Sequence, residues 1–228
     1  MQNASNLNIG VVLSGSGWKD GSEIHEAVCT LLALDKSHAG IIMMAPDKEQ
    51  LDVVNHWTNQ QVKNEERNVI IESARIARGN IRTIKDVSAS ELDGLILPGG
   101  IGAMKNLCNF AVKGMNMEVD RDLEKLLIEM HSQKKPLGFM CIAPIIAAKV
   151  FAQEHPTLTI GNDSVTASKI EAFGAKHVDC PVDDIVFDDN TLIVTTPAYM
   201  LGPSISDIAV GIEKLVNKVL ELADSRNG

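Results

Sequence analysis

The chain has 228 residues, of which 45% are hydrophobic and 22% charged, and this predicts one globular domain over residues 1–228. A domain of this size buries enough apolar surface to need neither disulfides nor a structural metal. The formal net charge of −9 argues against nucleic acids and anionic membrane surfaces as partners, and no apolar run is long enough to span a membrane.

Cysteine usage and the first residues of the chain bear on its compartment. The cysteines lack the paired spacing of zinc sites or disulfide frameworks; they are Cys29, Cys108, Cys141 and Cys180. Residues 1–8 carry neither the basic nor the apolar segment of a secretory signal. We therefore expect a reducing, cytoplasmic location, with no metal and no other cofactor.

The first half of the chain alternates apolar runs with helical periodicity. Residues 7–14 are predicted to form a buried strand, residues 22–36 a helix and residues 40–45 a second buried strand. The polar segment 51–80 interrupts this alternation, and we expect it to cover an edge or the mouth of the sheet. Residues 92–97 then form another buried strand, which the sequence Pro-Gly-Gly closes.

The second half continues in the same way. It is predicted to contain, in order, a helix over 117–131, a strand over 137–140, a helix over 142–151, a strand over 158–160, a helix over 168–173, a hairpin over 185–196 and a helix over 204–223. Alternating buried strands and helices indicate an α/β fold with a mostly parallel sheet. In such sheets ligands bind beyond the carboxyl ends of the strands, where the strand order reverses.

Cys141 lies where the predicted strand 137–140 ends and the predicted helix 142–151 begins. Pro144 fits the first turn of that helix, where proline is tolerated. A thiol in this position faces unpaired N–H groups and the positive end of the helix dipole, so we expect its pKa to be lowered. Cys141 is therefore the candidate nucleophile, with a buried structural cysteine as the alternative.

Glu26 is the candidate proton-transfer group. Asp20 and Glu23 have the spacing of a capping box, with Asp20 as the N-cap, and this leaves Glu26 without a capping role. If Glu26 faces Cys141, repulsion between thiolate and carboxylate raises the Glu26 pKa and suits it to shuttling protons. The alternative is an acidic residue that only stabilises the first turn of a helix.

The glycine pair Gly99–Gly100 follows a predicted strand, where it lets the backbone approach a ligand and present N–H groups to an anion. The N–H groups of Gly100 and Ile142 would then form an oxyanion hole. A tight turn that requires a positive φ explains the same pattern.

The segment 177–184 gathers His177, Cys180 and three aspartates. It suggests either a metal site or a histidine partner for Cys141. The spacing matches no metal motif, and an exposed approach to the hairpin explains the composition equally well.

A series of segments spread along the chain resembles the ThiJ/PfpI, class I glutamine amidotransferase-like superfamily. The resemblance is to its ElbB-type branch of sigma cross-reacting, isoprenoid-biosynthesis-associated, glyoxalase-like proteins. The segments are DGSEIHEA (20–27), APDK (45–48), LPGG (97–100), KNL (105–107), KPLGFMCIAP (135–144), CPVDDI (180–185) and TTPAYM (195–200).

The resemblance implies a flavodoxin-like three-layer sandwich with a nucleophile elbow, assembled as a homodimer. It assigns the nucleophile to Cys141, the carboxyl partner to Glu26, the backbone donors to Gly100 and Ile142, and substrate contacts to Gly99 and Asn106. Many members carry histidine directly after the nucleophile, where this chain has Ile142, and glutaminase relatives carry a late His-x-Glu pair that this chain lacks. Glutamine hydrolysis and peptidase activity are therefore not expected.

The resemblance and the residues together point to a cofactor-independent glyoxalase. It would convert glyoxal or a related 2-oxoaldehyde to a 2-hydroxy acid, such as glycolate, through a hemithioacetal on Cys141. The first alternative is a redox-sensing or interaction protein in which Cys141 is oxidised. The second is an amidotransferase or hydrolase subunit that needs a synthase partner.

Overall fold

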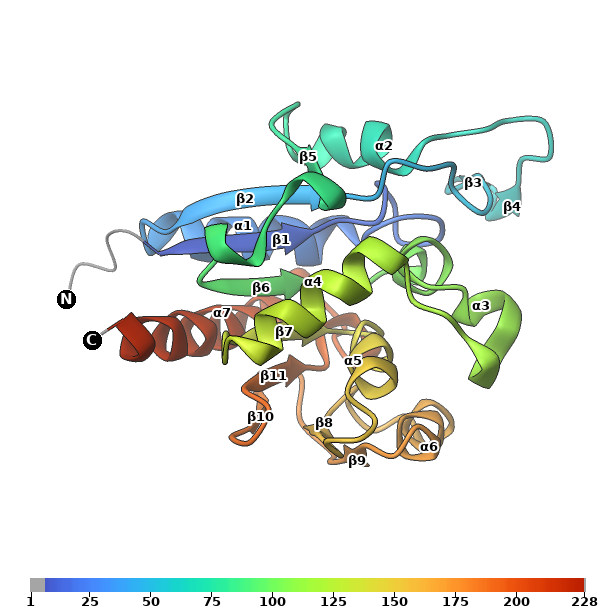
Figure 1. The fold of residues 1–228 in the computed structure, drawn as a ribbon. Coiled ribbons are helices and arrows are strands. Elements are labelled where there is room, and N and C mark those ends of the chain that lie inside the picture. The colour runs from blue at the N-terminus through green and yellow to red at the C-terminus, as the bar shows by residue number, and fades with distance from the viewer. Residues whose placement is uncertain (1–6, 228) are drawn as a thin grey trace.

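The computed structural model describes residues 7–227 and has a mostly parallel sheet of seven strands as its middle layer (Figure 1). The strands run in the order β10-β11-β7-β6-β1-β2-β5, and all neighbours are parallel except the pair β10 and β11. Their bounds are β1 (Asn8–Val12), β2 (Gly40–Ala45), β5 (Arg82–Thr83), β6 (Gly94–Leu97), β7 (Leu137–Met140), β10 (Val186–Asp188) and β11 (Ile193–Thr196). The predicted α/β, flavodoxin-like fold is confirmed.

Helices cover both faces of this sheet because successive crossovers step in opposite directions. The connection from β1 to β2 contains α1 (Ile24–Lys36), and the connection from β6 to β7 contains α4 (Arg121–Ser132). Right-handed crossovers that step in opposite directions place their helices on opposite faces. Helix α7 (Ile205–Asn227) packs with α1, and α5 (Pro144–Val150) packs with α4 (Figure 1). The order reverses between β1 and β6, which is where such folds bind ligands.

The remaining elements are short. They are β3 (Val54–Asn55), β4 (Gln60–Gln61), α2 (Val69–Ile76), α3 (Phe110–Lys113), β8 (Thr157–Leu158), α6 (Ser164–Ala172) and β9 (Lys176–His177), with single helical turns at 84–86, 89–91, 103–107, 114–116 and 198–200. Strands β3 and β4 form one small sheet, and β8 and β9 form another. The polar segment 51–80 thus contains β3, β4 and α2; Val54 contacts the loop after β1, and α2 packs against β2.

Most predicted elements agree with the structure, but α2 and α3 were not predicted, α7 ends at 227 rather than at 223, and α4 and α6 begin several residues away from their predicted starts. Helix α4 begins at Arg121 rather than at 117, because the Asp120 carboxylate accepts hydrogen bonds from the N–H groups of Asp122 and Leu123. Helix α6 begins at Ser164 rather than at 168, where the Asp163 carboxylate caps it. The predicted hairpin is confirmed. Of the predicted strand 158–160, only Leu158 lies in a strand, which is β8 of the small sheet and not a strand of the main one.

Asp188 ties the hairpin to β8. Its buried carboxylate accepts hydrogen bonds from the Thr157 N–H at 2.8 Å, and from the N–H and hydroxyl of Thr191, both at 2.9 Å. Burial alone would raise the pKa of this carboxyl, but the hydrogen bonds from Thr157 and Thr191 outweigh it and lower the pKa. Asp188 therefore stabilises the fold as an anion.

We expect Asp188→Ala to lower the free energy of unfolding by about 2–4 kcal/mol, since it leaves buried backbone donors without an acceptor. Urea denaturation at pH 7 measures this. In the wild type, the contribution is complete above the ordinary aspartate pKa near ~4 and is lost as the pH falls further. Asp189→Ala, at the exposed neighbouring position, is the matched control and should change stability by less than about 0.5 kcal/mol. Equal effects of the two substitutions would contradict this role for Asp188.

Candidate active site

Cys141 occupies a strained turn between β7 and α5. Its φ of 58° lies in the left-handed region of backbone conformation, which residues other than glycine rarely adopt. The Cys141 N–H donates to the Thr196 carbonyl at 3.0 Å, so the neighbouring strand β11 holds the turn in place. Pro144 then opens α5. The predicted nucleophile elbow is confirmed, and its strain of about 1–3 kcal/mol is of the kind that folds retain at functional sites.

Glu26 reaches the same place from the first turn of α1. Its side chain is fully buried, with Oε2 accepting from the Gly99 N–H at 2.8 Å and Oε1 from the Tyr199 N–H at 3.2 Å. The N-cap of α1 is Glu23, whose carboxylate accepts from the Glu26 N–H at 2.8 Å. The prediction of Asp20 as N-cap was wrong, because the Asp20 carboxylate instead accepts from the Val54 N–H at 2.7 Å.

Gly99 allows Glu26 and Cys141 to approach each other, and the two side chains share a hydrogen bond. A Cβ on residue 99 would lie 2.5 Å from the Cys141 Cβ and 2.8 Å from the Glu26 Oε2. No larger residue fits there without moving both groups. The role of Gly99 is thus to position Glu26 through its N–H, and it does not line the cavity described below.

The electrostatics of this pair differ from the expectation for the thiol. Burial, followed by the nearby Glu23 carboxylate, raises the pKa of Glu26 to about 7. Burial and the Glu26 carboxylate also raise the pKa of the Cys141 thiol well above its ordinary value. The predicted lowering of the thiol pKa was wrong, because desolvation outweighs the backbone N–H groups that favour the thiolate. Near neutral pH the thiol keeps its proton, and Glu26 is the group poised to accept it.

Two backbone N–H groups converge on the Cys141 sulfur. They belong to Gly100 and Ile142, and both oppose the rise in the thiol pKa through hydrogen bonds to it. Gly100 adopts a φ of 96°, and a Cβ there would lie 2.4 Å from the Glu23 nitrogen. Both residues also line a cavity that reaches Cys141. The structure therefore brings together the two donors that the sequence suggested for an oxyanion hole.

The cavity has a volume of about 650 Å³. It is lined by Trp18, Glu23, His25, Gly100, Ile101, Met104, Cys141, Ile142, Thr166, Tyr199 and Met200. Sequence reasoning did not select His25 and Tyr199, whose Nδ1 and Oη atoms lie 2.8 Å apart. Their place in the sequence could have indicated them, because both residues belong to segments that follow parallel strands, at the edge of the sheet where ligands bind.

Asn106 and His177 lie outside this cavity. The buried Asn106 side chain donates to the Ser14 and Asp20 carbonyls, both at 2.8 Å, and accepts from the Leu51 N–H at 3.1 Å. Its hydrogen-bonding groups thus hold loops together, and the predicted contact with substrate finds no support in its position. His177 lies on β9, where its Nε2 accepts from the Ile160 N–H at 3.3 Å.

Across residues 7–227, no cluster of three or more His, Cys, Asp and Glu side chains is arranged to hold a metal ion. Within the same residues, no helix has both the length and the apolar character needed to cross a membrane.

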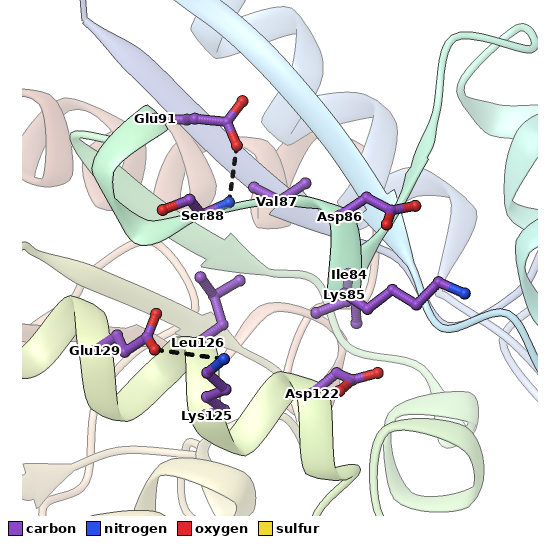
Figure 2. A pocket seen from close by; sticks show the side chains of 10 residues that line it. All are labelled: Ile84, Lys85, Asp86, Val87, Ser88, Glu91, Asp122, Lys125, Leu126 and Glu129. Atoms are coloured by element: carbon purple, nitrogen blue, oxygen red, sulfur yellow. Dashed lines mark hydrogen bonds and ion pairs between the residues drawn. The ribbon is translucent and has the colours of Figure 1, made fainter.

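A second cavity of about 330 Å³ lies between α4 and residues 84–91 (Figure 2). Figure 2 shows Glu91 accepting from the Ser88 N–H and an ion pair between Lys125 and Glu129 at its wall. The residues described as lining it include neither cysteine nor histidine. It therefore offers no counterpart to the Cys141–Glu26 pair.

Two named relatives match almost the whole chain. The ES1 protein homolog, mitochondrial, of Rattus norvegicus is 42% identical over 223 residues, which is 94% of this chain and 83% of that protein. The glutamine amidotransferase-like class 1 domain-containing protein 3, mitochondrial, of Homo sapiens is also 42% identical over 223 residues, covering 94% of this chain and 82% of that protein. No protein-family model matches the sequence.

These relatives contradict the prediction of a cytoplasmic location, since both are mitochondrial proteins, as is the ES1 protein of Danio rerio at 30% identity over 87% of this chain and 78% of that protein. The four cysteines form no disulfide with one another in the structure. Cysteine usage reports redox conditions, however, and does not distinguish one reducing compartment from another.

Solved structures agree with the fold. An isoprenoid biosynthesis protein with an amidotransferase-like domain from Ehrlichia chaffeensis is 35% identical, with a TM-score of 0.88 over 94% of this chain and 99% of that chain. A ThiJ/PfpI domain protein from Brachyspira murdochii shares the fold at 13% identity, with a TM-score of 0.57 over 96% of each chain. The chain therefore belongs to the class I glutamine amidotransferase-like family of these relatives, and it shares its fold with ThiJ/PfpI domain proteins.

Proposed function

We propose that this protein is a cofactor-independent glyoxalase that converts a 2-oxoaldehyde and water to a 2-hydroxy acid. The observation that carries the proposal is the pairing of Cys141 at a strained elbow with a buried Glu26 whose pKa is about 7. Membership of the class I glutamine amidotransferase-like family supports it, as does the resemblance to the ElbB-type branch, to which we assign the chain within this proposal.

The first step is attack of the Cys141 sulfur on the aldehyde carbon. The Glu26 carboxylate accepts the thiol proton as the carbon–sulfur bond forms, and then gives it to the carbonyl oxygen, which leaves a hemithioacetal. The N–H groups of Gly100 and Ile142 stabilise the negative charge that develops on that oxygen.

The second step is an isomerisation that Glu26 carries out on the bound intermediate. The carboxylate removes the proton from the carbon bonded to sulfur, which forms an enediolate held by the same N–H groups, and returns a proton to the neighbouring carbon. The hydroxyl proton of the hemithioacetal passes to the oxygen on that neighbouring carbon, so that the carbon bonded to sulfur becomes a carbonyl. The product is a thioester of a 2-hydroxy acid. Water activated by Glu26 then attacks the thioester, and the sulfur leaves and recovers its proton. The net reaction adds one water molecule and needs no external oxidant or reductant.

We prefer this function to a redox-sensing one because of the thiol itself. Burial and Glu26 raise the pKa of Cys141, and only 8% of the residue is exposed. Oxidation by peroxide proceeds through the thiolate of an accessible cysteine. A general base that removes the proton only during attack suits catalysis better than it suits sensing.

Cys141→Ser should lower kcat/KM for glyoxal at least about a thousandfold, since the alcohol is a far weaker nucleophile in this site. The measurement is NMR detection of glycolate formed from glyoxal without glutathione. Cys180→Ser, at a cysteine that does not line the cavity, is the matched control and should retain wild-type turnover. Equal rates for the wild type and Cys141→Ser would refute the proposed function.

The pH dependence of kcat/KM should follow Glu26. The carboxyl must be ionised to accept the thiol proton, so we expect kcat/KM to rise about tenfold per pH unit below pH 7 and to level off above it. Glu26→Gln should lower kcat/KM by about 10²–10⁴-fold and remove this step from the profile.

Glu23→Gln separates the two carboxylates. It keeps an oxygen to cap α1 but removes the charge that, after burial, raises the Glu26 pKa. The acidic limb of the profile should therefore move to lower pH while turnover persists. If the acidic limb of the kcat/KM profile is the same in Glu26→Gln as in the wild type, a group other than Glu26 governs that limb.

A further inference from the structure

The cavity at Cys141 is much larger than the simplest substrate of the proposed reaction. Its volume is about 650 Å³. Glyoxal occupies roughly the volume of two water molecules, about 60 Å³ at the ~30 Å³ that each takes in the liquid. Glyoxal would therefore fill about a tenth of the space, and most of the lining would have no contact with it. Cavities of this size bind molecules several times larger.

Most of the remaining lining is apolar. Trp18 comes from the loop after β1, Ile101 and Met104 follow β6, Ile142 follows Cys141, and Met200 lies after β11. Methionine is flexible and polarisable, so it adapts to apolar groups of different shapes. Trp18 is 49% exposed, and its ring offers a large surface that a ligand can cover.

The polar side chains of the lining already have partners within the protein. Glu23 accepts from the Glu26 N–H, His25 and Tyr199 bind each other, and the Thr166 hydroxyl donates to Asp163. Part of the hydrogen-bonding capacity of these side chains is therefore used within the protein. The N–H groups of Gly100 and Ile142 lie beside the sulfur, where they can also donate to a carbonyl oxygen on the carbon that the sulfur attacks.

Charge limits the ligand further. The lining contains the Glu23 carboxylate and adjoins that of Glu26, while neither lysine nor arginine is among the lining residues in the part of the chain that the structure describes. The Lys19 ammonium lies over the Trp18 ring, with its Nζ 4.7 Å from the ring centroid, but Lys19 is not among the lining residues. Beside Cys141 a negatively charged ligand would meet the Glu26 carboxylate and be repelled by it. A neutral aldehyde enters without this penalty, and the carboxylate product is then driven out.

We propose that the substrate of this site is a neutral 2-oxoaldehyde that carries an apolar chain or ring. The two carbonyl groups lie at Cys141 and its backbone donors, and the apolar group packs against Trp18, Ile101, Met104 and Met200. This inference rests on the proposed glyoxalase function and narrows its substrate class.

The test is a series of 2-oxoaldehydes with increasing alkyl chains, from glyoxal and methylglyoxal to hexylglyoxal, assayed with the full chain. Each methylene buried in the cavity should raise kcat/KM by roughly fourfold until the apolar lining is covered, the equivalent of ~0.8 kcal/mol. Trp18→Ala should reduce the ratio of kcat/KM for hexylglyoxal to that for glyoxal by at least about fivefold. Trp57→Ala is the matched control, since Trp57 is 93% exposed and lies outside the lining, and the ratio should not change.

A kcat/KM that stays flat or falls with chain length would overturn the inference and leave the glyoxalase function intact. If no member of the series is turned over, the function fails, and binding to Cys141→Ser decides the inference. Titration calorimetry would then compare the neutral probes octane-1,2-diol and ethane-1,2-diol. Tighter binding of the octanediol, weakened by Trp18→Ala, would support an apolar ligand, and equal binding of the two diols would rule it out.

Discussion

The site depends on the burial of one carboxyl group against one thiol. Glu26 is fully buried, and it is held there by hydrogen bonds from the N–H groups of Gly99 and Tyr199. These donors come from segments that follow β6 and β11, so the carboxylate links α1 to two strands of the sheet. Burial disfavours the charged form of a carboxyl group and therefore raises its pKa. Here it raises the pKa of Glu26 to about 7, which suits a group that accepts a proton near neutral pH.

The same burial explains why the thiol differs from that of an exposed reactive cysteine. A helix N-terminus favours the thiolate, but the desolvation of Cys141 and the adjacent carboxylate act in the opposite direction and prevail. In the proposed function, the nucleophile is consequently stored as a thiol beside its own base. This arrangement follows the logic of hydroxyl nucleophiles, which are also activated only when a neighbouring base removes the proton.

The topology of the sheet explains why these groups meet. Strands β1 and β6 are neighbours, but their crossovers lead to opposite faces, so the loops after them diverge and leave space above the sheet. Trp18 lies in the first loop and Gly100 in the second, while Cys141 directly follows the adjacent strand β7. The cavity is therefore a consequence of strand order, and its apolar character comes from the side chains that the diverging loops supply.

Much of this could be predicted from residue patterns alone. The apolar runs at 40–45 and 137–140 coincide with β2 and β7, and the abrupt change at Cys141 indicated the elbow, because strand and helix periodicities are local properties of the sequence. Resemblance along the chain paired Glu26 with Cys141. The start of α4 depended on a cap by Asp120, and the role of Asn106 depended on carbonyl groups of two distant loops.

The sequence by itself determined most of the main strands and helices, the turn at Cys141, and Cys141 and Glu26 as the candidate pair. Only the tertiary structure decided the direction of the thiol pKa, because desolvation depends on what surrounds Cys141 in space and not on its neighbours along the chain. Tertiary structure also decided that Gly99 positions Glu26, that His25 meets Tyr199, and that apolar side chains from separate loops enclose one cavity. Contacts between residues far apart in the chain depend on how the elements pack, and local sequence patterns do not predict them.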